Sequence, residues 1–248
     1  MKILLIDTCG EIGSVALADT GAGAAALTAA TIAGRSASER LLPAIQELAA
    51  ARRSPLQSLS AVAVVHGPGS FTGVRVGLSA AKGLCEALNL PLIAISRLAV
   101  LADRVECPPS TRVNALLDAG RGEFYSGDYL GGICLREAML TRDQLLAAAA
   151  AVQASQQAQI AVACEPAVAE SVAALAPRLV AQLCAEDAFP LALRRIEQRA
   201  FDDAATLDAN YLRRTDAEIF AKPRSAADPS PTPRQPARTP GSRSVRVS

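Results

Sequence analysis

A glycine-rich stretch between an apolar strand and an amphipathic helix has the residue types and spacing that best fit chemistry. Residues 67–77 read Gly-Pro-Gly-Ser-Phe-Thr-Gly-Val-Arg-Val-Gly and follow the apolar run 61–65. A strand, a glycine turn and a helix N-terminus in this order present backbone N–H groups to a phosphate or to another backbone. No Gly-Lys-Ser/Thr closes the stretch, and its glycines do not follow G-x-G-x-x-G, which excludes Walker A and dinucleotide loops. A purely structural turn is the alternative.

The rest of the sequence supplies no complete catalytic set. His66 is the only histidine, so a histidine metal pair is excluded, and a Ser-His-Asp triad would depend on this one side chain beside a turn. Asp118 and Glu123 lie five residues apart across an expected hairpin turn and need not share a face. The cysteines form no C-x-x-C pair, and they stand at positions 9, 85, 107, 134, 164 and 184. We therefore predict no catalytic residues, no metal site and reduced thiols.

The composition is that of an alanine-rich globular α/β protein. Half of the 248 residues are hydrophobic, only 3% are aromatic, and the net charge is +1. Five arginines and one aspartate give residues 223–248 a charge of +4, so residues 1–222 carry −3 and offer no broad basic face to nucleic acid. No apolar run reaches the length of a membrane span, and Asp7 interrupts the first apolar run too early for a signal peptide. The sequence predicts a cytoplasmic protein without membrane contact.

The hydrophobic pattern predicts two similar halves. A strand ending in aspartate, a glycine-containing turn and a hairpin occur at the start of the chain and again after residue 111. We expect strands at 2–6, 14–17, 24–32, 61–65, 91–95, 113–117, 123–130, 133–140, 159–163 and 209–212, and helices at 37–53, 71–88, 142–152, 166–183 and 188–200. These give domains at 1–105 and 106–222, with residues from about 201 to 222 packing back on the first. Six prolines predict a disordered basic tail at 223–248.

The helix expected at 71–88 has two usable faces. One is an apolar stripe at alternating spacings of three and four, made by Phe71, Val74, Leu78, Ala81, Cys85 and Leu88. The other is a small-residue face of Gly73, Gly77 and Ala80, which another backbone could approach closely. Two faces favour a helix–helix contact in addition to packing on the chain's own sheet. Ordinary packing on that sheet alone is the alternative.

Together these features resemble the actin/sugar-kinase/Hsp70 (ASKHA) superfamily and, more closely, the bacterial TsaB family, also called YeaZ. The stretches that carry the resemblance are residues 6–8, 14–17, 38–43, 67–77, 118–125 and 211–214. They extend over residues 1–222, and the match at 67–77 is the most specific. The resemblance implies an α/β actin-like, ribonuclease H-like fold with duplicated β-β-β-α-β-α domains. Ala37 stands where family members often carry histidine.

The resemblance implies a non-catalytic subunit. Its TsaD partner transfers a threonylcarbamoyl group to the adenosine next to the anticodon in tRNAs that read ANN codons. The ATPase TsaE and the threonylcarbamoyl-AMP synthase TsaC complete the pathway, and tRNA is reached through the complex. We expect the helices at 37–53 and 71–88 to form the TsaD interface through Leu41, Ile45, Leu48, Gly73, Val74, Arg75, Gly77, Leu78 and Ala81. The same stripe could pair with itself in a homodimer of the isolated chain.

The resemblance also indicates where a nucleotide would lie. In active superfamily members the first-strand aspartate places a metal–nucleotide complex and glycine loops hold phosphates. The matching residues, which we expect to face a nucleotide, are Asp7, Thr8, Gly67, Gly69 and Ser70. We expect no cofactor of the chain's own, and ATP or ADP with Mg at the partner interface. The alternatives are an autonomous ATP-binding enzyme (a small-molecule kinase or an ATPase) and, least favoured, a peptidase.

Overall fold

The computed structural model describes residues 1–21, 26–33 and 36–212, and it contains two mixed sheets with the same strand order. The first sheet runs β3-β2-β1-β4-β5 and the second β8-β7-β6-β9-β10. In each half the first two pairings are antiparallel and the last two are parallel. This repeat confirms the predicted duplicated α/β fold.

The strand bounds follow the apolar runs of the sequence. The first sheet consists of β1 (Lys2–Asp7), β2 (Ile12–Asp19), β3 (Ala26–Ala33), β4 (Ala61–Val65) and β5 (Leu92–Ile95). The second consists of β6 (Arg112–Gly120), β7 (Glu123–Leu130), β8 (Ile133–Thr141), β9 (Gln159–Ala163) and β10 (Arg178–Leu179). Central strands β1 and β4 are continuous apolar runs because both of their faces are covered.

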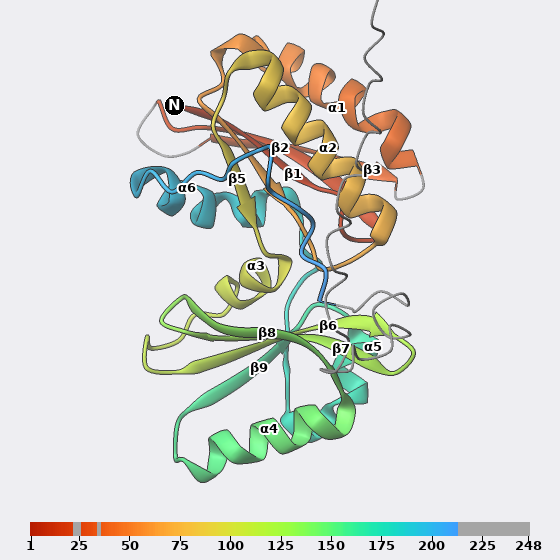
Figure 1. The fold of residues 1–248 in the computed structure, drawn as a ribbon, viewed down its shortest axis with the longest axis vertical. Helices are drawn as coiled ribbons and strands as arrows, with labels where there is room; N and C mark the ends of the chain where they lie inside the picture. Colours follow the sequence, from red (N-terminus) through yellow and green to blue (C-terminus); the bar gives the residue numbers. More distant parts are fainter. Residues whose placement is uncertain (22–25, 34–35, 213–248) are drawn as a thin grey trace, which may run out of the picture. The chain divides into compact units, whose positions relative to one another are not determined.

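Helices cover both faces of the first sheet. On one face α1 (Ala37–Ala51) and α2 (Phe71–Leu88) lie side by side, as Figure 1 shows. Contacts from the later part of the chain come from the short 3₁₀ helix η4 (Ala185–Ala188) and from α6 (Phe189–Glu197). The Ser14 hydroxyl fixes η4 because it accepts a hydrogen bond from the Ala185 N–H at 2.8 Å. The long helix α2 is therefore held against a fully covered sheet.

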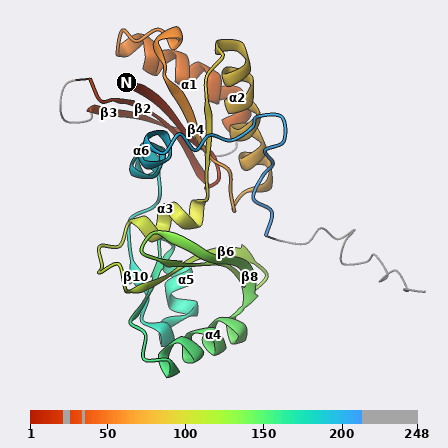
Figure 2. The ribbon, with the colours of Figure 1, turned by 60° about the vertical axis from the view of Figure 1, so that its left-hand side comes forward.

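The second half repeats this plan with shorter helices. Helix α3 (Arg97–Asp103) contacts β6, β7 and β9, while α4 (Arg142–Ala154) and α5 (Pro166–Ser171) form a separate small core with the same sheet (Figure 2). That core contains Leu116, Phe124, Leu145 and Val168. Where the first half has an 18-residue α2, the second has a six-residue α5.

Three sequence predictions need correction. The helix expected at 166–183 ends at Ser171 and is followed by a 3₁₀ turn at Ala173–Leu175. Helix does not resume after that turn, because Ala176 adopts a left-handed conformation and Pro177 follows it. The strand expected at 209–212 is absent from the described residues, where Asn210 donates a single backbone bond to the His66 carbonyl at 2.8 Å. Helix α3 was not expected. Its start is capped by the Ser96 hydroxyl, which accepts a bond from the Leu98 N–H.

The two sheets lie on either side of residue 105, and the described chain forms one compact unit. The division into domains at 1–105 and 106–222 stays a prediction. After α6 the chain runs along the first half, where the Asp202 N–H donates to the Leu92 carbonyl at 2.9 Å. The tail predicted at 223–248 lies outside the described residues. Among the described helices, none is long and apolar enough to cross a membrane.

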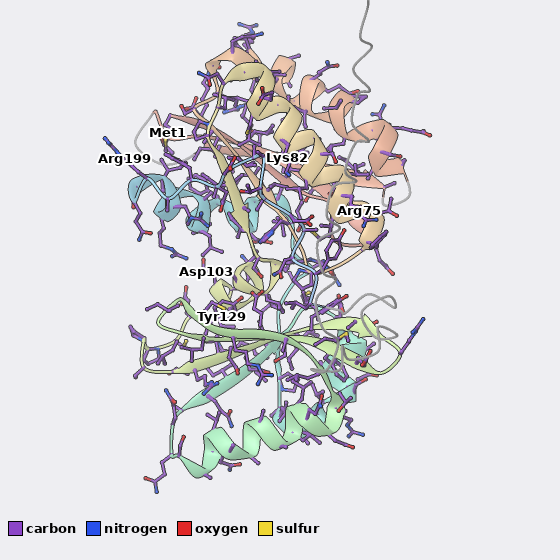
Figure 3. All side chains as sticks on the ribbon, viewed as in Figure 1. Met1, Arg75, Lys82, Asp103, Tyr129 and Arg199 are labelled. Carbon is purple, nitrogen blue, oxygen red and sulfur yellow. The ribbon has the colours of Figure 1, made fainter. Side chains whose placement is uncertain are left out.

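The Glu137 carboxylate joins three segments of the chain. Oε1 accepts hydrogen bonds from the Ser96 hydroxyl at 2.5 Å and from the Tyr129 hydroxyl, and Oε2 accepts one from the Asn210 amide at 2.7 Å. Burial, reinforced by the neighbouring Glu137 charge, raises the pKa of Tyr129, so its hydroxyl stays protonated and donates (Figure 3). This carboxylate therefore links α3, the second sheet and the segment after α6.

We expect Glu137→Gln to lower the free energy of unfolding by about 1–3 kcal/mol. A glutamine has one acceptor oxygen and a donating amide, so at least one of the three donors loses its partner. Urea denaturation gives the measurement. The control Glu170→Gln, on the exposed side of α5, should change stability by less than about 0.5 kcal/mol. Equal effects of the two changes would contradict the linking role of Glu137.

Candidate functional site

The turn between β1 and β2 packs directly on the start of α2. The Thr8 hydroxyl donates to the Gly73 carbonyl at 2.6 Å, and the Ser70 N–H donates to the Cys9 carbonyl at 2.8 Å. The Ser70 hydroxyl caps α2 by accepting a bond from the Gly73 N–H at 3.3 Å. Residues 7–9, which we call the first turn, are thereby joined to the glycine stretch.

Three glycines make this contact possible. A Cβ atom on Gly73 would lie 2.0 Å from the Thr8 carbonyl oxygen, and one on Gly77 would lie 2.3 Å from the Thr8 hydroxyl oxygen. A Cβ on Gly69 would lie 2.4 Å from the Cys9 carbonyl oxygen. The glycines recur every four residues, which brings them to one side of the helix and its lead-in. The close backbone approach predicted for the small-residue face is therefore made by the chain's own first turn.

The structure brings Asp7, Thr8, Gly69 and Ser70 together, but these residues bond to or pack against other groups of the chain. Asp7 and Thr8 are only 2% exposed. The Asp7 carboxylate accepts a hydrogen bond from the Cys9 N–H at 2.8 Å, and the Thr8 hydroxyl is bonded to Gly73. Gly67 has a φ of +108°, and a Cβ there would lie 3.3 Å from the Asn210 carbonyl oxygen. In this arrangement Asp7 and Thr8 are buried and bonded within the chain, whereas Ser70 is exposed, and a nucleotide contact stays a prediction.

Arg97 is a buried cation beside the first turn that the sequence analysis missed. It is 5% exposed, and among the described residues its Nε atom has no hydrogen-bond partner. Its Nη2 atom would lie 2.8 Å from a Cβ on Gly10. Burial alone would lower the pKa of the guanidinium, but the negative charges of Asp7 and Glu165 raise it. A lone arginine in the apolar run 92–102 was the available signal.

After β9, where the first half has its glycine stretch after β4, the second half has a carboxylate. After β9 the chain reads Cys164-Glu165-Pro166 instead of a glycine stretch. The Glu165 carboxylate accepts a bond from the Asp118 N–H at 3.0 Å, and the Asp118 carboxylate accepts one from the Gly120 N–H at 2.8 Å. The junction after β9 therefore presents a carboxylate, which repels a phosphate. Asp118 itself is exposed, unlike Asp7.

The residues predicted to contact a partner face inward, with one exception. Buried within the chain are Leu41, Ile45, Leu48, Gly73, Val74, Gly77, Leu78 and Ala81. An apolar stripe with spacings of three and four looks the same whether it packs on the chain's own sheet or on another helix. Here these side chains pack within the chain, and a partner contact through the two helices stays a prediction. Arg75 is the exposed member of the set.

Arg75 lies in an exposed aromatic group that we call the Phe71–Arg75–Tyr211 cluster. The Arg75 Cζ atom is 3.5 Å from the centroid of the Phe71 ring and 5.5 Å from that of Tyr211. The two ring centroids are 5.9 Å apart, and the residues are 59% and 42% exposed, respectively. Figure 3 labels Arg75 on α2. The sequence analysis placed Phe71 in the apolar stripe and Tyr211 in a strand, so it missed the cluster.

Among the described residues, no group of three or more His, Cys, Asp or Glu side chains is placed to hold a metal ion. The Cys9 thiol is held protonated, because burial and then the neighbouring Asp7 charge raise its pKa well above the ordinary value. Its Sγ atom donates to the Val65 carbonyl at 3.1 Å. Cys9 thus acts as a packing residue between the first turn and β4.

The chain is similar to proteins of tRNA modification. Residues 29–221 match the family model described as TsaD: tRNA N6-adenosine threonylcarbamoyltransferase. The tRNA threonylcarbamoyladenosine biosynthesis protein TsaB of Escherichia coli (strain K12) is 38% identical over 130 residues, which are 52% of this chain and 55% of that protein. The TsaB protein of Bacillus subtilis (strain 168) is 35% identical over 129 residues, with the same shares. The alignments thus span about half the length of these curated relatives.

Two solved structures from Pseudomonas aeruginosa cover more of the chain. One is described as an uncharacterized protein with similarity to peptidase YEAZ; it is 30% identical and superposes with a TM-score of 0.70 over 86% of this chain and 99% of that one. The other is described as YeaZ, is 28% identical, and has a TM-score of 0.64 over 83% of this chain and 98% of that one. Both therefore share nearly their whole length with this fold.

The glycine contact predicts opposite effects for two substitutions in one helix. Gly73→Ala would place a methyl group against the Thr8 backbone, so we expect it to lower the free energy of unfolding by at least about 2 kcal/mol. Gly83→Ala has no atom within 4 Å to meet and lies in the same helix. It should raise stability by roughly 0.5–1 kcal/mol. Urea denaturation measures both, and similar values would contradict the packing role of Gly73.

Proposed function

Because this chain belongs to the TsaB/YeaZ family, with a TsaD-type family domain over residues 29–221, we propose that it takes part in making threonylcarbamoyladenosine in tRNA. We propose further that its role is that of a non-catalytic subunit which binds TsaD and supports the transfer that TsaD carries out. TsaE, TsaC and tRNA enter this proposal as members of the same pathway, with tRNA reached through the complex.

The subunit proposal rests on the structural role of the glycine stretch. Its glycines dock α2 on the first turn, so the most specific family motif serves to position a helix. The same stretch presents Phe71 and Arg75 to solvent. Aromatic and arginine side chains are enriched at the centres of protein interfaces. One motif thus fixes a helix from the inside and forms an exposed cluster on the outside.

The geometry of the cluster suits a protein partner. The guanidinium of Arg75 is stacked near both rings, so the three side chains are partly ordered before binding. Preordered side chains lose less conformational entropy when a partner covers them. We therefore assign the TsaD contact to the outer side of α2 around this cluster, in place of the buried stripe that the sequence suggested. Self-pairing of the isolated chain could use the same side.

Size-exclusion chromatography with light scattering, on the chain alone and mixed with its cognate TsaD, tests the proposal. We expect a stoichiometric heterodimer that Arg75→Glu and Phe71→Ser each weaken at least about tenfold, since each removes a central contact. The control is Arg142→Glu, a charge reversal at an exposed position of the second half, which should leave binding unchanged. Absence of a complex at low salt, or equal effects of Arg75→Glu and Arg142→Glu, would contradict the assignment.

A nucleotide test separates this proposal from the autonomous enzyme. ATP or ADP with Mg at the TsaD interface stays part of the proposal, whereas the isolated chain should show no saturable Mg–ATP binding up to millimolar concentrations, because Asp7 and Thr8 are already bonded. Isothermal titration calorimetry provides the measurement. Tight binding by the isolated chain, lost on Asp7→Ala but kept in Asp118→Ala, would favour an ATP-binding enzyme instead.

A further inference from the structure

A cavity of about 660 Å³ lies between the second sheet and α4. This volume falls in the range that small organic ligands occupy. Its sheet side is lined by Arg112, Asn114, Ser126, Asp128 and Arg136. The opposite side is lined largely by alanine, leucine and valine residues of α4 and by the loop that follows it.

The sheet side of the cavity is polar where the first half is apolar. In the first sheet, Ile6 faces α2, since it lies 3.5 Å from the Cβ position of Gly77. The cross-strand pairs on that face are Ile6 with Val15 and Leu4 with Leu17.

In the second sheet the pairs on the face under α4 are Leu116 with Ser126 and Asn114 with Asp128. Three of these four residues are polar. A helix-covered sheet face is normally filled by apolar side chains, so these polar residues call for an explanation beyond packing.

The helix side explains why the space stays open. In the first half α1 fills the layer with the buried side chains of Leu41, Ile45 and Leu48. At the matching layer of the second half, α4 carries five consecutive alanines at 147–151, and Leu145 is its buried residue. A methyl group cannot bridge the separation between a helix and a sheet, so the space over the polar strand residues is not filled by the chain.

The polar residues form a hydrogen-bond network in which one buried donor has no partner among the described residues. The Asn114 amide donates to the Ser126 hydroxyl at 2.9 Å and to an Asp128 carboxylate oxygen at 2.8 Å. Arg112 Nη2 pairs with the other Asp128 oxygen at 2.9 Å. The Arg112 Nε atom is buried and, among the described residues, has no hydrogen-bond partner. A buried donor needs an acceptor, which a water or a ligand in the cavity can supply.

The charge at the cavity favours an anion. Its charged lining residues are Arg112, Asp128 and Arg136, which leaves one net positive charge. Arg112 already neutralises Asp128. We propose that this cavity binds a small organic molecule with one oxyanion group, a carboxylate or a phosphate, and an apolar body. The oxyanion accepts hydrogen bonds from Arg112 Nε and pairs with Arg136, and the apolar body lies along the alanines of α4.

Calorimetric titration of the full chain at low salt tests the proposal with octanoate, octyl phosphate and octan-1-ol, which share one apolar body. We expect one site per chain and at least tenfold tighter binding of one of the two anions than of the alcohol. The anion that binds more tightly identifies the head group.

Two helix substitutions locate the site. Ala149→Phe fills the cavity and should abolish binding. Ala147→Phe, at an exposed position of α4 that does not line the cavity, should keep it. Arg112→Gln retains a donor for Asp128 but removes the charge, so it should weaken the anion at least about tenfold and leave the alcohol unchanged. Thermal melting of each variant checks that it folds.

The proposal fails if neither anion binds the wild-type chain, or if octan-1-ol binds as tightly as both anions. It also fails if anion binding survives Ala149→Phe in a folded variant. Where Ala149→Phe does not fold, Arg112→Gln decides: unchanged affinity for the anion overturns the proposal.

Discussion

The close contact between the first turn and the glycines of α2 is the constraint on which the rest of the first half depends. No side chain fits between the Thr8 backbone and Gly73, so α2 can approach the first turn this closely only with glycine at this position. Once α2 is fixed, its stripe fills the space over β1 and β4, and α1 packs beside it. On its outer side Phe71 and Arg75 are stacked on each other and exposed. A motif type associated with phosphates serves here to hold a helix and to display a surface.

The two halves share one topology but differ in helix length, in charged groups and in packing. Both sheets have the same strand order, yet the second half has a short α5, a carboxylate at Glu165 where the first half has its glycine stretch, and an underfilled layer beneath α4. Arg97 lies beside the first turn, and the charges of Asp7 and of Glu165 both raise the pKa of its guanidinium. The first half is therefore tightly packed around α2, and the second half contains the cavity beneath α4.

Much of the fold could be predicted from the sequence, because strand and helix periodicities are local. The duplicated pattern, the bounds of α2 and the importance of residues 67–77 all followed from spacing. The direction of a stripe could not be predicted, since Leu41 and Leu78 have the same pattern whether they meet a sheet or a partner. Residues brought together from distant positions were also missed. Tyr211 meets Phe71 across 140 positions, and the Glu137 contacts depend on three separate segments. Arg97 and the polar floor of the cavity had only weak local signals.

Hydrogen–deuterium exchange of the chain, alone and with its cognate TsaD, tests the central claim most directly. If the glycine stretch holds α2 internally and displays its outer side, the backbone of residues 7–9 exchanges slowly in the isolated chain and does not change on binding. Protection then appears on adding TsaD at the start of α2 and around Tyr211. Fast exchange at residues 7–9 that slows only with Mg–ATP, without new protection near Phe71 and Tyr211 in the mixture, would contradict the claim.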